Sequence, residues 1–126
     1  LNILTVNALT AATGVLIPVQ CEFFALQGLS ELMTTIDTIK SSSNENLVIK
    51  GIIRTMFDPR NNLATDVSAQ LIKFFTDKLY RTMIPRNITL AEAPSHGLPV
   101  IKYDKSSKGA LSYLSLVGEI LKQEKL

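Results

Sequence analysis

Short apolar runs alternate along the chain with longer segments in which apolar residues recur every three or four positions. The short runs are rich in β-branched residues and predict strands over residues 14–19, 47–57 and 78–84. Helical periodicity is found over residues 1–12, 22–40, 61–75, 87–93 and 106–121. The alternation predicts an α/β fold with a partial parallel sheet of about three strands covered by helices, in a single unit over residues 1–126.

The same patterns predict where the helices begin and which faces they bury. Asn61 or Asn62 can cap the third helix and Ser106 or Ser107 the last, whereas no capping residue precedes the first. The predicted buried faces are Leu1, Leu4 and Ala8 in the first helix; Ala25, Leu29, Leu32, Ile36 and Ile39 in the second; Leu63, Val67, Leu71 and Phe75 in the third; and Ala110, Tyr113, Leu114, Val117, Ile120 and Leu121 in the last. The first strand is continuously apolar, so we expect it to be buried on both faces.

Composition limits the class of protein. With 126 residues and 46% hydrophobic content, the chain is long and apolar enough to form a folded core. No apolar run approaches the roughly 18 residues that span a bilayer, and no signal-peptide layout opens the chain. The single cysteine, Cys21, cannot form an internal disulfide, which fits a reducing cytoplasm. Because the sequence opens inside a helical pattern and predicts a narrow sheet, we expect it to be part of a larger protein.

Charge is unevenly distributed along the chain. The net charge is only +2, but all thirteen basic residues lie from Lys40 onward. The charged residues before Lys40 are all acidic. An anionic partner is therefore expected to bind the last two thirds of the chain.

The ends of the predicted strands are candidates for a ligand site, because ligands of parallel α/β sheets bind beyond the carboxyl ends of the strands. These ends read "PVQCE", "TMFDPRNN" and "IPRN". Pro85 fixes its own φ and pushes Ile84 into an extended conformation, so the third strand must end there. Arg86 and Asn87 then lie at the edge of the sheet. They either face a ligand or serve as a surface arginine and the cap of the next helix.

Three longer stretches carry a resemblance to a known family. They are "LTVNALTAATGVLIPVQCEFFALQGLSEL", "TMFDPRNNLATDV" and "MIPRNITLAEAPSHGLPVIKYDKSSKGALSYL". In this order they closely resemble the ParA/Soj-type partition ATPases, over nearly the whole chain. The resemblance implies a P-loop ATPase of the deviant-Walker type that dimerises around ATP and Mg and binds DNA without sequence preference. It also implies a cytoplasmic, nucleoid-associated protein and a ParB/Spo0J-type partner that stimulates hydrolysis.

One part of the family pattern is missing from the sequence. No lysine here lies in the Gly-rich context of a phosphate loop, which cradles phosphates on backbone N–H groups and a lysine. The resemblance therefore implies the C-terminal half of such an ATPase. We expect no catalytic residue, no metal ligand and no tightly bound ATP or Mg in this chain by itself.

The resemblance also implies roles for individual residues. The adenine pocket should be lined by Met56, Phe57, Asp58, Pro85, Arg86 and Asn87. An Asn amide can pair with an adenine edge, and Met or Pro can pack on its face. Gln20 and Glu22 should lie at the dimer interface, although Glu22 can equally be an acid at a helix N-terminus. Phe23 and Phe24 are expected to pack in the core.

For DNA, the family pattern has one base after "TMFD" and another two residues beyond "PRN". Arg60 matches the first, but Thr89 occupies the second position. Lys102, Lys105 and Lys108 can supply the missing charge, or can be a solvated basic loop, and we expect them to lie outside the two adenine loops. His96 has no second ligand at metal spacing, so a turn or packing role is expected. Cys21 is expected to be buried.

Two other functions remain open at this point. A MinD-like membrane-associated ATPase would need a basic amphipathic tail beyond the core, and the final "GEILKQEKL" is short, with Ile120 and Leu121 assigned to the core face. A non-catalytic α/β binding module would lack a phosphate loop altogether.

Overall fold

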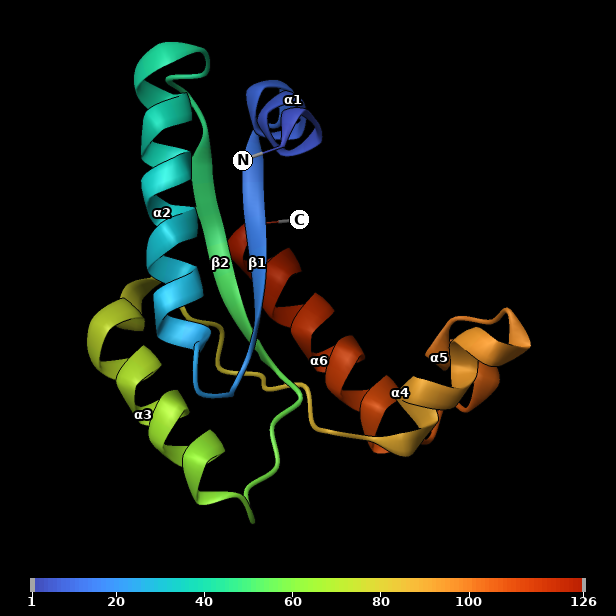
Figure 1. The fold of residues 1–126 in the computed structure, drawn as a ribbon. Helices are drawn as coiled ribbons and strands as arrows, with labels where there is room; N and C mark the ends of the chain where they lie inside the picture. The colour runs from blue at the N-terminus through green and yellow to red at the C-terminus, as the bar shows by residue number, and fades with distance from the viewer. Residues whose placement is uncertain (1, 126) are drawn as a thin grey trace.

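A two-stranded parallel sheet with helices on both faces forms the centre of the protein, as seen in a computed structural model that describes residues 2–125 (Figure 1). The elements are α1 (Ile3–Ala11), β1 (Gly14–Gln20), α2 (Ala25–Ser42), β2 (Val48–Thr55), α3 (Asn62–Phe75), the short 3₁₀ turn η1 (Thr76–Lys78), α4 (Ile88–Glu92), η2 (Ala93–His96), α5 (Val100–Tyr103) and α6 (Lys108–Gln123). The α/β class predicted from the sequence is confirmed.

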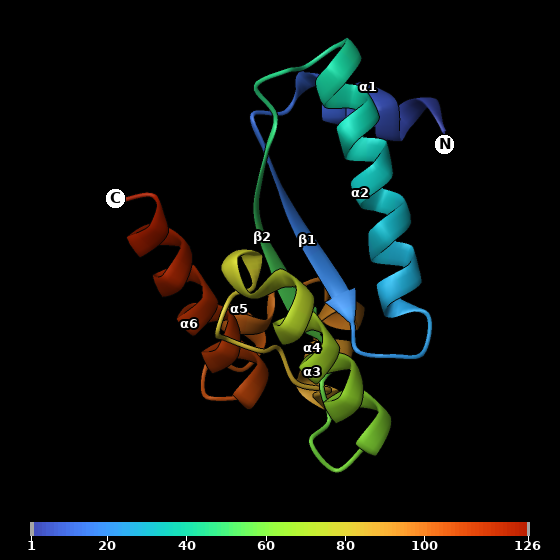
Figure 2. The same ribbon diagram turned by 90° about the vertical axis from the view of Figure 1, so that its left-hand side faces the viewer.

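The two strands are joined by α2 in a parallel crossover. Gly14 pairs with Val48 and Gln20 with Thr55, with one irregularity between Val15 and Leu16. Figure 2 shows the sheet between α2 on one side and α6 on the other. The carboxyl ends of both strands therefore lie at the same end of the molecule.

Two apolar clusters lie on the two faces of β2, because successive residues of a strand point to opposite faces. Ile52 is fully buried in the larger cluster, with Ile36 of α2 and Leu71 of α3. Ile53 belongs to the smaller cluster, with Tyr80, Ile84 and Leu116 of α6. Their burial is the main apolar contribution to stability on each face.

Three of the helix predictions are confirmed. Asn61 caps α3 by accepting from the backbone N–H groups of Leu63 and Ala64, and Ser107 caps α6 by accepting from Ala110. The predicted face of α2 is buried, through Leu29, Ile36 and Ile39.

Three helix faces differ from the prediction. In α3, Val67 and Leu71 are buried as predicted, but Leu63 is 43% exposed and Ala64 is buried instead. The first helix does have a cap, since the Asn2 side chain accepts from the Thr5 N–H, and it buries Leu9 while Leu4 is 74% exposed; Leu1 lies outside the described residues. The last helix buries Leu116, whereas the predicted core positions Tyr113, Leu114, Val117 and Leu121 are exposed. In α6 the apolar residues form a face wider than the side that packs on the rest of the protein, so periodicity alone could not select the covered part.

The first strand is covered on one face only, against the prediction. Ile17 and Val19 are buried, while the alternate residues Leu16, Pro18 and Gln20 are exposed. Although its sequence is continuously apolar, β1 therefore alternates between buried and exposed residues, as a strand with one covered face does.

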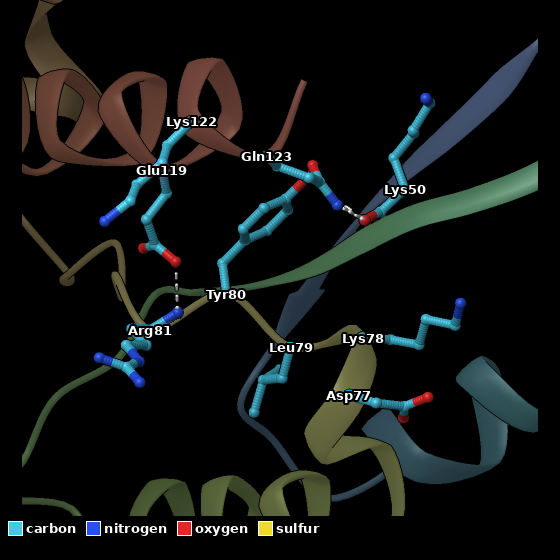
Figure 3. Close-up of a pocket in the computed structure, with 9 residues that line it drawn as sticks. All are labelled: Lys50, Asp77, Lys78, Leu79, Tyr80, Arg81, Glu119, Lys122 and Gln123. Atoms are coloured by element: carbon cyan, nitrogen blue, oxygen red, sulfur yellow. Dashed lines mark hydrogen bonds between the residues drawn. The ribbon is translucent and has the colours of Figure 1, made fainter. Parts of the chain in front are cut away.

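The third predicted strand, residues 78–84, lies beside β2 but is not a regular strand. It makes two isolated parallel bridges, Leu79 with Ile52 and Pro85 with Phe57. The Glu119 carboxylate of α6 accepts the backbone N–H groups of Arg81, at 2.9 Å (Figure 3), and of Thr82, at 2.6 Å. The Tyr80 N–H donates to the Ile52 carbonyl, so a regular ladder would next use the Thr82 N–H, which Glu119 takes instead. The Ile84 N–H donates to the Arg54 carbonyl in its place, and the strand ladder is interrupted.

Gly51 gives a first test of this arrangement. A Cβ at Gly51 would overlap the Tyr80 ring, whose hydroxyl donates to Gln123 Oε1 at 2.7 Å. We expect Gly51→Ala to lower the free energy of unfolding by about 1–3 kcal/mol, because the buried ring must move. Urea unfolding would measure this. In the control Gly28→Ala, nothing lies within 4 Å of the new Cβ, and a gain of about 0.5–1 kcal/mol is expected for an α-helix. A neutral Gly51→Ala would contradict the close packing of Tyr80 on β2.

Glu119 gives a second test, through pH. Burial alone would raise its pKa, but hydrogen bonds from Thr82 and Arg81 outweigh burial and lower the pKa of Glu119 below its usual value. Its contribution is then fully present above its ordinary pKa and is lost as the pH falls through the lowered one. We expect Glu119→Gln to cost about 1–2 kcal/mol at pH 7. The difference from wild type should shrink as both are acidified below about pH 4. A difference that is constant with pH would show that the charge of Glu119 is unimportant.

Candidate functional site

The loops after β1, after β2 and after residues 79–84 meet at one end of the sheet. The Cys21 N–H donates to the Thr55 carbonyl at 3.3 Å, the Phe57 N–H to the Ile84 carbonyl at 3.1 Å, and the Arg86 N–H to the Phe57 carbonyl at 3.0 Å. These backbone bonds place the three predicted strand ends side by side. This is the position at which ligands bind in parallel α/β sheets.

A hollow of about 430 Å³ lies where these loops meet the start of α3. It is lined by Gln20, Cys21, Glu22, Met56, Asp58, Asn61, Leu63, Ala64 and Arg86. The structure thus brings three of the residues predicted for adenine, Met56, Asp58 and Arg86, together with Gln20 and Glu22, which were predicted for the dimer interface. We call this the α3-side hollow.

The other predicted adenine residues lie elsewhere. Phe57 and Pro85 line a second hollow of about 440 Å³, on the α6 side of β2, together with Pro59, Met83, Lys108, Leu111 and Ser112. We call this the α6-side hollow. Lys108 lies in α6, outside the adenine loops as expected, but it is close to them. It lines the same hollow as Phe57 and Pro85, because the first turn of α6 packs beside the end of β2.

Asn87 serves as a helix cap. Its side-chain oxygen accepts from the Leu90 N–H at 3.3 Å at the start of α4. The amide nitrogen makes no hydrogen bond within the described part of the chain, so the cap leaves both N–H donors of the Asn87 side chain available for a ligand.

Met56 has a backbone conformation that the sequence did not reveal. Its φ is +53°, in the left-handed region that non-glycine residues seldom adopt. The cost of such a conformation is typically about 1–3 kcal/mol, and it persists where the surrounding structure fixes it. It directs the chain from β2 into the loop that carries Asp58 and Arg60.

Asp58 and Arg60 form an ion pair in this loop. Arg60 Nε donates to Asp58 Oδ1 and Nη2 to Oδ2, both at 3.0 Å, and the Arg60 backbone N–H also donates to Oδ1. The hydrogen bonds of Arg60 lower the pKa of the Asp58 carboxyl, and the nearby positive charge of Arg86 acts in the same direction. Asp58 is therefore ionised at neutral pH.

Sequence reasoning missed Arg54, a buried arginine within β2. Its guanidinium donates to Ser68 Oγ at 3.1 Å and to the carbonyls of Tyr80 at 2.8 Å and Arg81 at 3.2 Å. Burial lowers the pKa of Arg54 and raises the pKa of Cys21, which is buried as expected. A charged residue inside an apolar strand pattern was the signal that could have found it.

The predicted DNA-binding lysines lie around α5 and the start of α6. Lys102, Lys105 and Lys108 are all exposed, and none forms an ion pair with another described residue. Thr89 is in α4. In Figure 1, α4 and α5 project together from the body of the protein.

His96 has the packing role that was expected. Its ring stacks on Tyr103, with 4.8 Å between the ring centroids, and the Tyr103 hydroxyl donates to Glu92. Phe23 and Phe24, in contrast, were predicted to be core residues and are 73% and 68% exposed. They pack edge to face on each other in the loop between β1 and α2.

A third cavity, of about 420 Å³, lies away from the strand ends (Figure 3). It is formed between the residues after α3 and the end of α6, and its lining includes Lys50, Tyr80, Arg81, Glu119 and Gln123. The Gln123 amide donates to the Lys50 carbonyl, and Lys50 pairs with Glu124 at 3.0 Å. These side chains are occupied with one another, which indicates a structural role.

Residues 2–125 contain no group of three or more His, Cys, Asp or Glu side chains that is arranged to hold a metal ion. None of the helices in that range is both long and apolar enough to cross a membrane.

Comparison with known proteins identifies the family. A family model described as an AAA domain matches residues 1–49. The chain is 51% identical to the sporulation initiation inhibitor protein Soj of Bacillus subtilis over 120 residues, which are 95% of this chain and 47% of Soj. It is 48% identical to the chromosome partitioning protein ParA of Caulobacter vibrioides over 125 residues, which are 99% of this chain and 47% of ParA. The chain belongs to the ParA/Soj family. It spans about half the length of the curated relatives it matches.

A solved structure has the same fold as this ParA/Soj-family chain. Cobyrinic acid a,c-diamide synthase from Mycobacterium smegmatis, with bound ADP and magnesium, superposes with a TM-score of 0.73 at 27% identity. The match covers 98% of this chain and 43% of the synthase. The predicted fold class is thereby confirmed by a second, structural comparison.

Proposed function

We propose that this chain is the part of a ParA/Soj-type ATPase for DNA segregation that supplies the adenine side of the nucleotide site, a dimer surface and a surface for non-specific DNA binding. The observation that carries the proposal is the similarity to Soj and ParA, which extends over nearly the whole chain. The meeting of three strand ends around the α3-side hollow supports a ligand site at the same place. The partner proposed from the family is a ParB/Spo0J-type protein.

The residues present fit the base of a nucleotide better than its phosphates or its metal. Met56 offers an apolar surface in the α3-side hollow. Asn87 lines neither hollow, but its side-chain amide N–H groups suit a base edge at the neighbouring loop. No group of acids in the described residues suits magnesium. When bound, ATP would supply the phosphoryl chemistry, while the residues of this chain would bind and orient the base.

Gln20 and Glu22 are proposed to face a second copy of the protein. Both are exposed at the mouth of the α3-side hollow, next to the exposed Phe23 and Phe24. Exposed aromatic residues beside polar ones are typical of protein interfaces.

A membrane-associated ATPase was one of the two alternative functions, beside a non-catalytic α/β binding module. The sequence argument against the membrane-associated ATPase was that Ile120 and Leu121 belong to the core face. This is wrong for Leu121, which is 43% exposed on α6. The Caulobacter vibrioides relative is a chromosome partitioning protein, however, and this favours DNA over a membrane as the partner.

The nucleotide part is tested at Asn87, in the complete gene product. We expect Asn87→Ala to weaken ATP binding by about 1–3 kcal/mol, since a buried partner on adenine would lose its hydrogen bond. Calorimetric titration with ATP and with GTP would measure affinity and base preference. The matched variant is Asn87→Ser, which keeps a capping oxygen for α4 but has no amide. If Asn87→Ser binds ATP as wild type does, Asn87 is only a helix cap.

The DNA part is tested at Lys102 and Lys105, since Lys108 lies beside the adenine loops. The double variant Lys102→Ala, Lys105→Ala should bind DNA more weakly. Its log affinity should also depend less steeply on log salt, by about 0.9 for each lost phosphate contact. ATP affinity should not change. The control is Lys40→Ala with Lys73→Ala, two exposed lysines on α2 and α3. An unchanged salt slope in the first variant would remove these lysines from the DNA surface.

A further inference from the structure

The loop between β2 and α3 holds its arginine in an unusually complete ion pair. Both oxygens of Asp58 accept from the Arg60 guanidinium, and Oδ1 also accepts the backbone N–H of Arg60. A bidentate pair of this kind fixes the plane of the guanidinium as well as its distance. Arg60 is therefore not a freely rotating surface charge.

The two partners differ in their exposure. The Arg60 side chain is 88% exposed, whereas the Asp58 side chain is 21% exposed and forms part of the wall of the α3-side hollow. Asp58 is thus in a fixed position at the base of the loop, and Arg60 extends from it into solvent. Any polyanion that approaches Arg60 also approaches the Asp58 carboxylate.

An ionised carboxylate at this position opposes binding of a phosphate in two ways. It occupies two of the five N–H donors of the guanidinium, and its negative charge cancels the charge that a phosphate would experience. Asp58 is ionised at neutral pH, because the hydrogen bonds of Arg60 and the nearby charge of Arg86 lower the pKa of its carboxyl. The net charge at the tip of the loop is consequently close to zero while the pair is intact.

We propose that Asp58 restrains Arg60 and thereby lowers the affinity of this loop for DNA phosphates. The inference rests on the proposed function, because it takes Arg60 as a DNA contact. In addition to the residues proposed to contact DNA, it assigns Asp58 a role in setting the affinity for DNA. Exposed ion pairs are weak, so Asp58 attenuates binding and does not abolish it.

The test is Asp58→Asn in the complete gene product, with ATP present. Affinity for a mixed-sequence DNA duplex is measured by fluorescence anisotropy at several salt concentrations. We expect binding to become about two- to fivefold tighter, which is the range that an exposed ion pair can account for. The matched control is Asp66→Asn, which removes an exposed acid on α3 that forms no ion pair with a described residue. It should change the affinity much less.

Arg60→Ala separates a specific restraint from a general charge effect. On this background, Asp58→Asn should no longer tighten binding, because no arginine remains to be released. Tightening that persists in the double variant, or tightening of the same size in Asp66→Asn, would overturn the restraint. Unchanged or weaker binding in Asp58→Asn would overturn it too, since it would mean that Asp58 is neutral for Arg60 or orients it for DNA.

The outcomes also distinguish this inference from the proposed function. If the wild-type protein binds no DNA, both fail. If wild type binds DNA and Arg60→Ala weakens it, but Asp58→Asn has no effect, only the restraint fails. Circular dichroism monitors folding of each variant, and Asp58→Ser, which also removes the carboxylate, provides the same comparison if Asp58→Asn is unstable.

Discussion

The buried guanidinium of Arg54 determines how the end of the sheet is built. Burying a cation costs free energy unless its donors are satisfied, and here one β2 side chain reaches α3 through Ser68 and residues 80–81 through two carbonyls. Its Nε is buried and has no hydrogen-bond partner among the described residues. Because the Arg54 guanidinium makes no other hydrogen bond among the described residues, its partners can move little. Helix α3 and residues 79–84 are therefore fixed relative to β2.

The position of the ligand loops follows from this constraint. Residues 79–84 are not a regular strand, because Glu119 takes the N–H groups of Arg81 and Thr82. The carbonyls of Tyr80 and Arg81 bind Arg54 instead of a neighbouring strand. Polar side chains therefore replace part of the β ladder, and the backbone bonds of Phe57 with Ile84 and Arg86 complete the alignment. Residues 79–84 are thus held by the side chains of Arg54 and Glu119, and the chain that follows them places Arg86 in the same hollow as Asp58.

The sequence predicted the elements better than it predicted their environment. Periodicity identified α2, α3 and α6, and capping chemistry selected Asn61 and Ser107, because both signals are local. The exposed faces of β1 and α6 depend on which elements lie against them, and apolar residues on several sides of a helix leave that choice open. The interrupted third strand was unpredictable for a similar reason. Its partners, Arg54 and Glu119, are distant from it in sequence, and only the folded chain brings them together.

The residues of the candidate site were predicted as one group, and the structure divides them between two hollows. Side chains alternate across the sheet, so Arg54 points to the α3 side and Ile53 to the α6 side. Beyond β2, where Met56 leaves the extended conformation, the loop also contributes to both sides: Met56 and Asp58 line the α3-side hollow, while Phe57 and Pro59 line the α6-side hollow. Phe57 also packs against the larger apolar cluster. Arg86 and Pro85 divide in the same way. A motif such as "TMFDPR" therefore contributes to two surfaces at once. A base bound between these loops could contact only one of the two sets directly, and the other set would act by fixing the backbone between them.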